Sequence, residues 1–182
     1  MNWRRVANFC FFQAGWFACV LGAAEEIDWV GPVFVATWVA GFTLTSRLRT
    51  ELLRTLAVAI VIGFLADSLL VKLEVLSFRN EGLELGPTRL WMIALWMNFA
   101  ATLTSSLSWL LGRPLLSAGL GLATAPVAYL GAESLGAVAL SSPSWASALW
   151  IGGAWAVALP ALAFAAARAE PAPELVAQEG TT

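Results

Sequence analysis

Long apolar segments, separated by short polar connections, dominate this sequence. About 20 helical residues cross the roughly 30 Å of hydrocarbon in a bilayer, and six segments are long and apolar enough to do so. They cover residues 6–24, 29–46, 55–71, 90–111, 115–131 and 145–167. Because lipid offers the backbone no hydrogen-bond partner, each segment is predicted to be helical. The pattern therefore predicts an all-α, polytopic integral membrane protein, in which residues 1–168 form a bundle of six transmembrane helices.

The basic residues in the connections predict how this bundle is oriented. If the N-terminus lies in the cytoplasm, seven basic residues fall on the cytoplasmic side and three on the outer side. Since basic residues concentrate on the cytoplasmic side of membrane proteins, we expect both termini to be cytoplasmic (N-in/C-in). Residues 169–182 contain two prolines, three glutamates and no anchoring pattern, a composition typical of disorder. We expect them to form a disordered cytoplasmic tail.

The first apolar segment follows two arginines and has an alternative interpretation as a signal peptide. It is longer than the apolar region of a usual signal peptide and contains Asn8 and Gln13. Five further apolar segments follow it. We therefore interpret it as a retained transmembrane helix.

The longest connection, residues 72–89, carries a second structural signal. Residues 75–78 and 83–85 are short runs typical of strands, and the polar residues 79–82 between them are typical of a turn. This pattern predicts a small hairpin or an ordered loop on the outer face.

Composition supports the membrane assignment and excludes one class of partner. Hydrophobic residues make up 59% of the chain and charged residues 12%, and the mean hydropathy is +0.77. Soluble domains carry about 25% charged residues, so this chain has too little charge to cover a soluble globule. A net charge of −2 argues against nucleic acid as a partner, because nucleic-acid binding needs a concentrated basic face.

The chain lacks the residues that most enzymes and metalloproteins use. It contains no histidine, which is the commonest zinc ligand and the usual general base near neutral pH. Cys10 and Cys19 face opposite sides of one predicted helix, so we expect no disulfide between them. Neither a metal-ligand cluster nor a phosphate-binding glycine loop is present. We therefore expect no metal and no cofactor, and the sequence favours a protein that is not an enzyme without deciding the matter.

Asp67 is the most informative polar residue. It lies within the third predicted segment, about 6 Å from the middle toward the outer face. A carboxyl group inside a membrane is costly and usually faces protein or water. Two interpretations remain open: a carboxyl that titrates protons or binds a ligand, and a structural carboxyl that ties helices together by hydrogen bonds.

Polar residues on the fourth predicted segment form a stripe. Spacings of four, three and four residues place them on one helical face, and they are Asn98, Thr102, Ser105 and Trp109. Helix packing through hydrogen bonds is the alternative to a binding role for these side chains.

The outer half of the predicted membrane region holds one candidate pocket. Asp67, Asn98, Tyr129 and Glu133 come from the third, fourth and fifth segments and are assigned to similar depths. We expect them to line an outward-opening polar pocket that binds a ligand. Gln13, in the first segment, is a further candidate ligand-binding residue.

Arginines gather on the predicted cytoplasmic side. Arg47, Arg49, Arg54 and Arg113 are candidates for contacts with lipid phosphates. The alternative is that they only determine topology and are solvated by headgroups.

Several short motifs follow one another along the chain: residues 12–24 (FQAGWFACVLGAA), 62–70 (IGFLADSLL), 99–103 (FAATL), 106–110 (SLSWL) and 125–129 (APVAY). In this order they resemble the motifs of a family of small polytopic inner-membrane proteins of bacteria with unknown function. The resemblance implies a retained first helix and a single bundle, and it points again to Gln13, Asp67 and Tyr129. It also implies a connection with lipid metabolism, because such proteins are often encoded near lipid-modification genes of the cyclopropane-fatty-acid type. This chain departs from the family pattern at residues 72–74 (KLE), which leaves the end of the third helix undecided.

Three functional hypotheses follow for a protein of the bacterial inner membrane. The first is binding or transport of a lipid or small amphipathic molecule through the candidate pocket. The second is a lipid-modifying membrane enzyme or its accessory subunit. The third is a membrane scaffold, whose partner is another membrane protein or a second copy of this chain. Membrane lipids are expected partners in each case.

Overall fold

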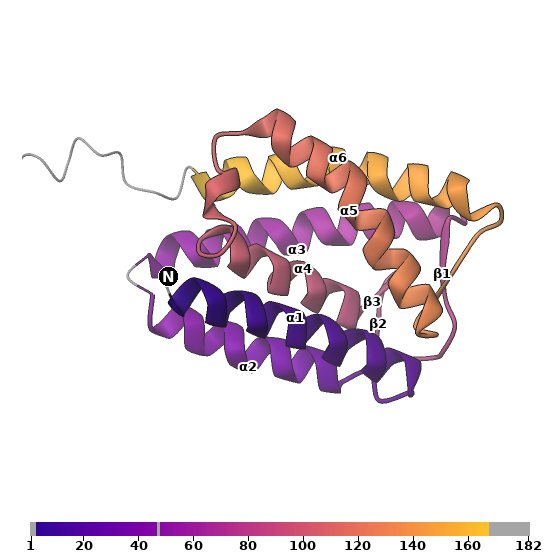
Figure 1. Cartoon of the computed structure of the whole chain (residues 1–182). Helices are drawn as coiled ribbons and strands as arrows, with labels where there is room; N and C mark the ends of the chain where they lie inside the picture. The colour runs from indigo at the N-terminus through magenta and orange to yellow at the C-terminus, as the bar shows by residue number, and fades with distance from the viewer. Residues whose placement is uncertain (1–2, 47, 168–182) are drawn as a thin grey trace, which may run out of the picture.

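The computed structural model describes residues 3–46 and 48–167, and these residues form six α-helices (Figure 1). The helices are α1 (Trp3–Ala24), α2 (Val30–Leu44), α3 (Arg49–Lys72), α4 (Leu90–Leu103), α5 (Pro114–Ser134) and α6 (Ser144–Ala167). Successive helices run in opposite directions, so α1 begins at the end of the bundle where α6 finishes (Figure 1). Arg47 and the predicted tail, residues 169–182, lie outside the described residues.

α4 lies at the centre of the bundle. It packs against α1, α2 and α3, whereas α5 packs chiefly against α6. Ten of the 14 residues of α4 are buried, which explains why this helix is apolar on nearly all sides. The core of the molecule therefore follows α4, with α1 and α2 on one side and α5 and α6 on the other (Figure 1).

Four of the helices, α1, α3, α5 and α6, are long and apolar enough to cross a membrane. α2 and α4 are apolar but shorter, with 15 and 14 residues. Many large apolar side chains on the helices point outward, including Leu115 and Val157, which are 88% and 73% exposed. An apolar exterior of this extent is what lipid, rather than water, solvates.

The fourth helix ends earlier than the sequence pattern predicts. α4 stops at Leu103, and the rest of the predicted segment forms a turn and a short 3₁₀-helix, η1 (Ser108–Leu110). The carbonyl of Thr102 accepts hydrogen bonds from the backbone N–H groups of Ser105 and Leu107. Local hydroxyl groups compete with helical hydrogen bonds, and this stretch is rich in Ser and Thr. The predicted stripe is therefore interrupted after Thr102.

Two small sheets lie at the end of the bundle opposite Trp3. β1 (Leu76–Phe78) pairs with β4 (Val138–Leu140), and β2 (Glu84–Leu85) pairs with β3 (Thr88–Arg89), both antiparallel. The two extended runs predicted in residues 72–89 are present as β1 and β2, and the segment does contain a hairpin. It joins β2 to β3, however, and not the two predicted runs to each other. The loop between α5 and α6 supplies the partner for β1, and the backbone of Gly86, with φ of 61°, makes the tight turn between β2 and β3.

Candidate functional site

Asp67 sits at the centre of a buried hydrogen-bond network. Its side chain is fully buried. The Trp96 indole N–H donates to Oδ2 over 2.7 Å, and the Tyr129 hydroxyl donates to Oδ1 over 2.7 Å. Each carboxyl oxygen thus has a partner, and the three side chains connect α3, α4 and α5.

The position of Trp96 depends on Gly63, one helical turn before Asp67. A Cβ atom on Gly63 would collide with the Trp96 ring, so glycine lets the indole lie against the backbone of α3. The Trp96 ring also stacks on Trp155 of α6, with ring centroids 4.2 Å apart and an interplanar angle of 12°. Trp96 is therefore held between two helices while its N–H reaches Asp67.

Asn98 belongs to a different network. Two residues along a helix point to nearly opposite sides, so Asn98 faces away from Trp96. Its Nδ2 donates to the backbone carbonyl of Phe12 over 2.9 Å, and its Oδ1 accepts from the Trp38 indole N–H over 3.0 Å. A Cβ atom on Gly15 would lie 2.8 Å from the Asn98 amide. Asn98 thus joins α4 to α1 and α2, away from Asp67.

Glu133 is engaged at the end of α5. Its Oε1 accepts a hydrogen bond from the backbone N–H of Leu140 over 2.9 Å, which anchors β4 to the helix. The structure therefore brings Asp67 and Tyr129 together, and it places Asn98 and Glu133 at other positions.

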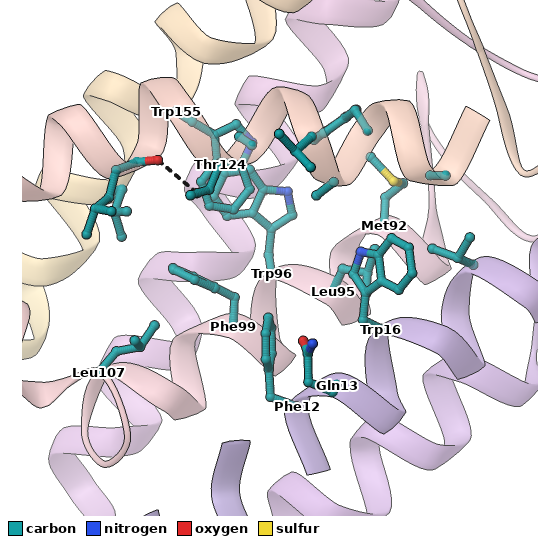
Figure 2. Close-up of a pocket in the computed structure, with 18 of the residues that line it drawn as sticks. Phe12, Gln13, Trp16, Met92, Leu95, Trp96, Phe99, Leu107, Thr124 and Trp155 are labelled. Carbon is teal, nitrogen blue, oxygen red and sulfur yellow. Dashed lines mark hydrogen bonds between the residues drawn. The ribbon is translucent and has the colours of Figure 1, made fainter. Parts of the chain in front are cut away.

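A cavity of about 660 Å³ lies between α1 and α4 on one side and α5 and α6 on the other. Figure 2 shows its aromatic wall, with Phe12 and Trp16 from α1, Trp96 and Phe99 from α4, and Trp155 from α6. Gln13 and Tyr129 also line this cavity, whereas Asp67, Asn98 and Glu133 do not. The wall is mostly apolar, in contrast to the polar pocket that the sequence predicts.

Asp67 does not line the cavity but contacts two residues that do. The two side chains that donate to its carboxyl group, Trp96 and Tyr129, both line the cavity. Asp67 therefore fixes the orientation of two wall residues without being accessible to an occupant. A ligand-binding role for the predicted residues stays a prediction.

The cavity opens at the molecular surface between α1 and α5. Among its lining residues, Phe9 and Phe17 of α1 are 47% and 49% exposed, and Val127 of α5 is 68% exposed. The Trp16 side chain extends from α1 toward α5. A Cβ atom on Gly131 of α5 would lie 3.5 Å from the Trp16 ring. α1 and α5 thus approach each other at Trp16, and exposed apolar side chains flank the opening.

Three of the four predicted phosphate-binding arginines lie within the described residues. Arg49 begins α3, Arg54 follows on the same helix, and Arg113 directly precedes α5. All three are exposed, and these helices begin at the same end of the bundle as α1 (Figure 1). Their contact with lipid phosphates stays a prediction.

From the sequence alone, Trp96 and Trp155 are candidates either to wall a pocket or only to fill the bundle, and the structure places both in the wall of the cavity. Both were recognisable as tryptophans deep within apolar segments, where an indole N–H needs an acceptor. Gly63, four residues before Asp67, carried a further signal, since a glycine inside a helix often allows a bulky group to approach closely.

Comparisons with known proteins identify a family. Residues 5–161 match the family described as "Protein of unknown function (DUF2878)". No curated protein and no solved structure is significantly similar to this sequence. The match covers most of the chain, so this protein belongs to the DUF2878 family.

Proposed function

We propose that this protein binds the hydrocarbon chain of a lipid or another amphipathic molecule in the cavity between α1 and α5. The cavity itself is the observation that carries the proposal. Its volume of about 660 Å³ falls within the roughly 300–1,000 Å³ of small-molecule sites, which are mostly apolar and contain a few polar groups. Aromatic rings and aliphatic side chains form most of this wall, and Gln13, Thr124 and Tyr129 supply polar groups.

The surroundings of the opening support a lipid as the occupant. The helices that flank it, α1 and α5, are both long and apolar enough to cross a membrane. Half-exposed Phe9 and Phe17 lie at its edge. An opening with such a border faces hydrocarbon when the helices span a bilayer, so a lipid chain enters sideways without crossing water.

The proposal includes a topology. We place all six helices across the inner membrane of a bacterium, with both chain ends in the cytoplasm. α1 begins at the same end of the bundle at which α6 finishes, which supports placing both chain ends on one side of the membrane (Figure 1). The exposed arginines at that end, Arg49, Arg54 and Arg113, favour the cytoplasm for it.

Native mass spectrometry of the full-length protein, released from its own membranes, tests the binding function. Ala128 lines the cavity, so Ala128→Phe adds a ring to the space that an occupant needs. Ala161 is an exposed residue of α6 that does not line the cavity, so Ala161→Phe is the matched control. We expect a discrete bound species on the wild type and on the control, and its loss from Ala128→Phe.

Two results contradict the proposal. One is the same heterogeneous mixture of bulk lipids on all three proteins, which indicates an unselective surface. The other is a discrete bound protein in place of a lipid, which indicates a scaffold or an accessory subunit.

A further inference from the structure

Gln13 presents an unpaired amide to the cavity. Its side chain is exposed and makes no hydrogen bond to any other described residue. The close-up of the cavity shows its amide group between Phe12 and Trp16 (Figure 2). An amide offers two N–H donors and a carbonyl acceptor, and leaving them unpaired in an apolar environment is costly.

The hydroxyl groups in the wall, by contrast, already have partners. The Tyr129 hydroxyl donates to Asp67, and the Thr124 hydroxyl donates to the carbonyl of Leu120 over 2.8 Å. The Trp155 indole N–H in the same wall is a buried donor without a hydrogen-bond partner among residues 3–46 and 48–167, but it cannot accept a hydrogen bond. Within the described residues, Gln13 is therefore the lining side chain that offers both free donors and a free acceptor to an occupant.

Charge restricts the chemistry of that occupant. No Asp, Glu, Lys or Arg lines the cavity within the described part of the chain. A charged group placed there has no counterion within a mostly apolar wall, which is strongly unfavourable. The group that meets Gln13 is therefore uncharged.

The depth of Gln13 in the membrane restricts the chemistry of the occupant further. Gln13 lies near the middle of α1, about 15 Å from Trp3 and about 16 Å from Ala24 along the helix axis. The hydrocarbon of a bilayer is about 30 Å thick, so Gln13 lies near the bilayer centre when α1 spans the membrane. The ester groups of a phospholipid lie at the interface, about half that thickness away. A phospholipid held in its usual position does not bring an ester oxygen to Gln13.

We infer that the cavity selects a long-chain lipid with an uncharged oxygen, a hydroxyl or carbonyl, that hydrogen-bonds to Gln13 within the hydrocarbon region. This inference rests on the proposed function and narrows its substrate class. Gln13 donates to either kind of oxygen and accepts from a hydroxyl, while the aromatic wall packs against the chain. The chain that carries this oxygen is either alkyl or prenyl.

A pair of photoreactive probes tests the inference on the full-length protein in phosphatidylcholine nanodiscs. Both probes are octadecane chains that carry a diazirine; one has a mid-chain ketone, and the other has a methylene group in its place. Peptide mass spectrometry measures labelling of cavity residues relative to labelling of outward-facing residues. Gln13→Met removes the amide and keeps the length of the side chain. Ala14→Met is the matched control, because Ala14 is exposed and does not line the cavity.

We expect the ketone probe to label the wild-type cavity about three- to tenfold more than the methylene probe, the ratio that one hydrogen bond produces. The preference persists in Ala14→Met and disappears in Gln13→Met. Equal labelling of the wild-type cavity by both probes overturns the inference and leaves chain binding intact. If neither probe labels the cavity above the outward-facing residues, the proposed function fails as well.

Discussion

The interface between α1 and α4 and the interface between α5 and α6 are held together in different ways. Polar side chains join α1 to α4: the Asn8 amide donates to the carbonyl of Ala101 over 3.2 Å, and Asn98 donates to the carbonyl of Phe12. The Asn8 amide also accepts a hydrogen bond over 2.7 Å from Ser106, in the turn that follows α4. Glycines join α5 to α6. A Cβ atom on Gly121 would collide with the carbonyl of Trp155, and one on Gly152 would lie 2.8 Å from the carbonyl of Leu122.

The cavity lies between two helices, α1 and α5, that in the part of the chain described by the structure are joined neither by polar side chains nor by close glycine contacts. Among the described residues, no side-chain hydrogen bond joins α1 to α5. The close backbone contact of Gly121 faces α6, whereas Gly131, which faces α1, leaves room for a Cβ atom at an ordinary 3.5 Å from the Trp16 ring. The bond from Tyr129 to Asp67 ties α5 to the central helices. Lipid offers helices no hydrophobic driving force for association, so close packing and hydrogen bonds determine which helices meet. Space remains between α1 and α5 because the described residues that face each other across this gap form few close packing contacts and no side-chain hydrogen bond.

The largest expected effect comes from filling a glycine contact. Gly121→Leu places a side chain against the backbone of α6, which cannot yield without separating the helices, so we expect about 3 kcal/mol of destabilisation or loss of the folded protein. Gly119→Leu, on the same helix, is the control, because a Cβ atom there meets nothing within 4 Å. Thermal unfolding of the purified proteins in one detergent compares them. Equal unfolding temperatures would contradict a glycine-dependent interface.

A smaller effect is expected from Asn98→Leu. The substitution removes two hydrogen bonds and leaves the buried Trp38 indole N–H and the Phe12 carbonyl without their partner, which costs about 1–3 kcal/mol. Thr37→Val is a suitable control, since its exposed hydroxyl bonds only to the carbonyl of Val33, one turn away. We expect that control to remain within about 0.5 kcal/mol of the wild type. Denaturant unfolding measures the free energy of unfolding of both variants. Similar losses of stability in Asn98→Leu and Thr37→Val would show that the Asn98 hydrogen bonds are dispensable.

The smallest effect is expected at the hydrogen bond between Tyr129 of α5 and Asp67 of α3. Tyr129→Phe removes the hydroxyl that donates to Asp67, and Asp67→Asn weakens the acceptor. Interhelical hydrogen bonds in membranes average about 0.6 kcal/mol and reach about 1.7 kcal/mol in double-mutant cycles. We expect a coupling energy in this range from the two single variants and the double variant. Strictly additive losses would mean that the two side chains do not interact in the membrane.

Hydrophobic patterning predicted the helices well because their apolar runs are long. Each of the six predicted segments overlaps an observed helix, and the start of α6 at Ser144 lies within one residue of the prediction, whereas α3 begins at Arg49, six residues before its predicted segment. The end of α4 differs because the run of hydroxyl residues after Thr102 turns the backbone, and mean hydropathy does not register such a local competition. Strand pairing differs because residues 75–78 pair with a strand about 60 positions away, beyond the range of any local pattern.

The sequence singled out Asp67 and Tyr129, which the structure brings into contact, but it did not predict how the candidate residues are arranged. Depth along each segment correctly indicated that Asp67 and Tyr129 are near the same level, yet depth contains no information on rotation about the helix axis. Asn98 shares that level and faces α1 and α2. Rotation is determined by contacts between helices, such as Gly63 beneath Trp96, and these depend on the packing of the whole bundle.

A density map of the full-length protein in lipid nanodiscs, obtained by cryo-electron microscopy with a bound antibody fragment, tests the central claim most directly. The account predicts an elongated, chain-like density between α1 and α5, running past Gln13 and against the ring of Trp96. A map in which α1 and α5 close on each other and leave no space between them would contradict it.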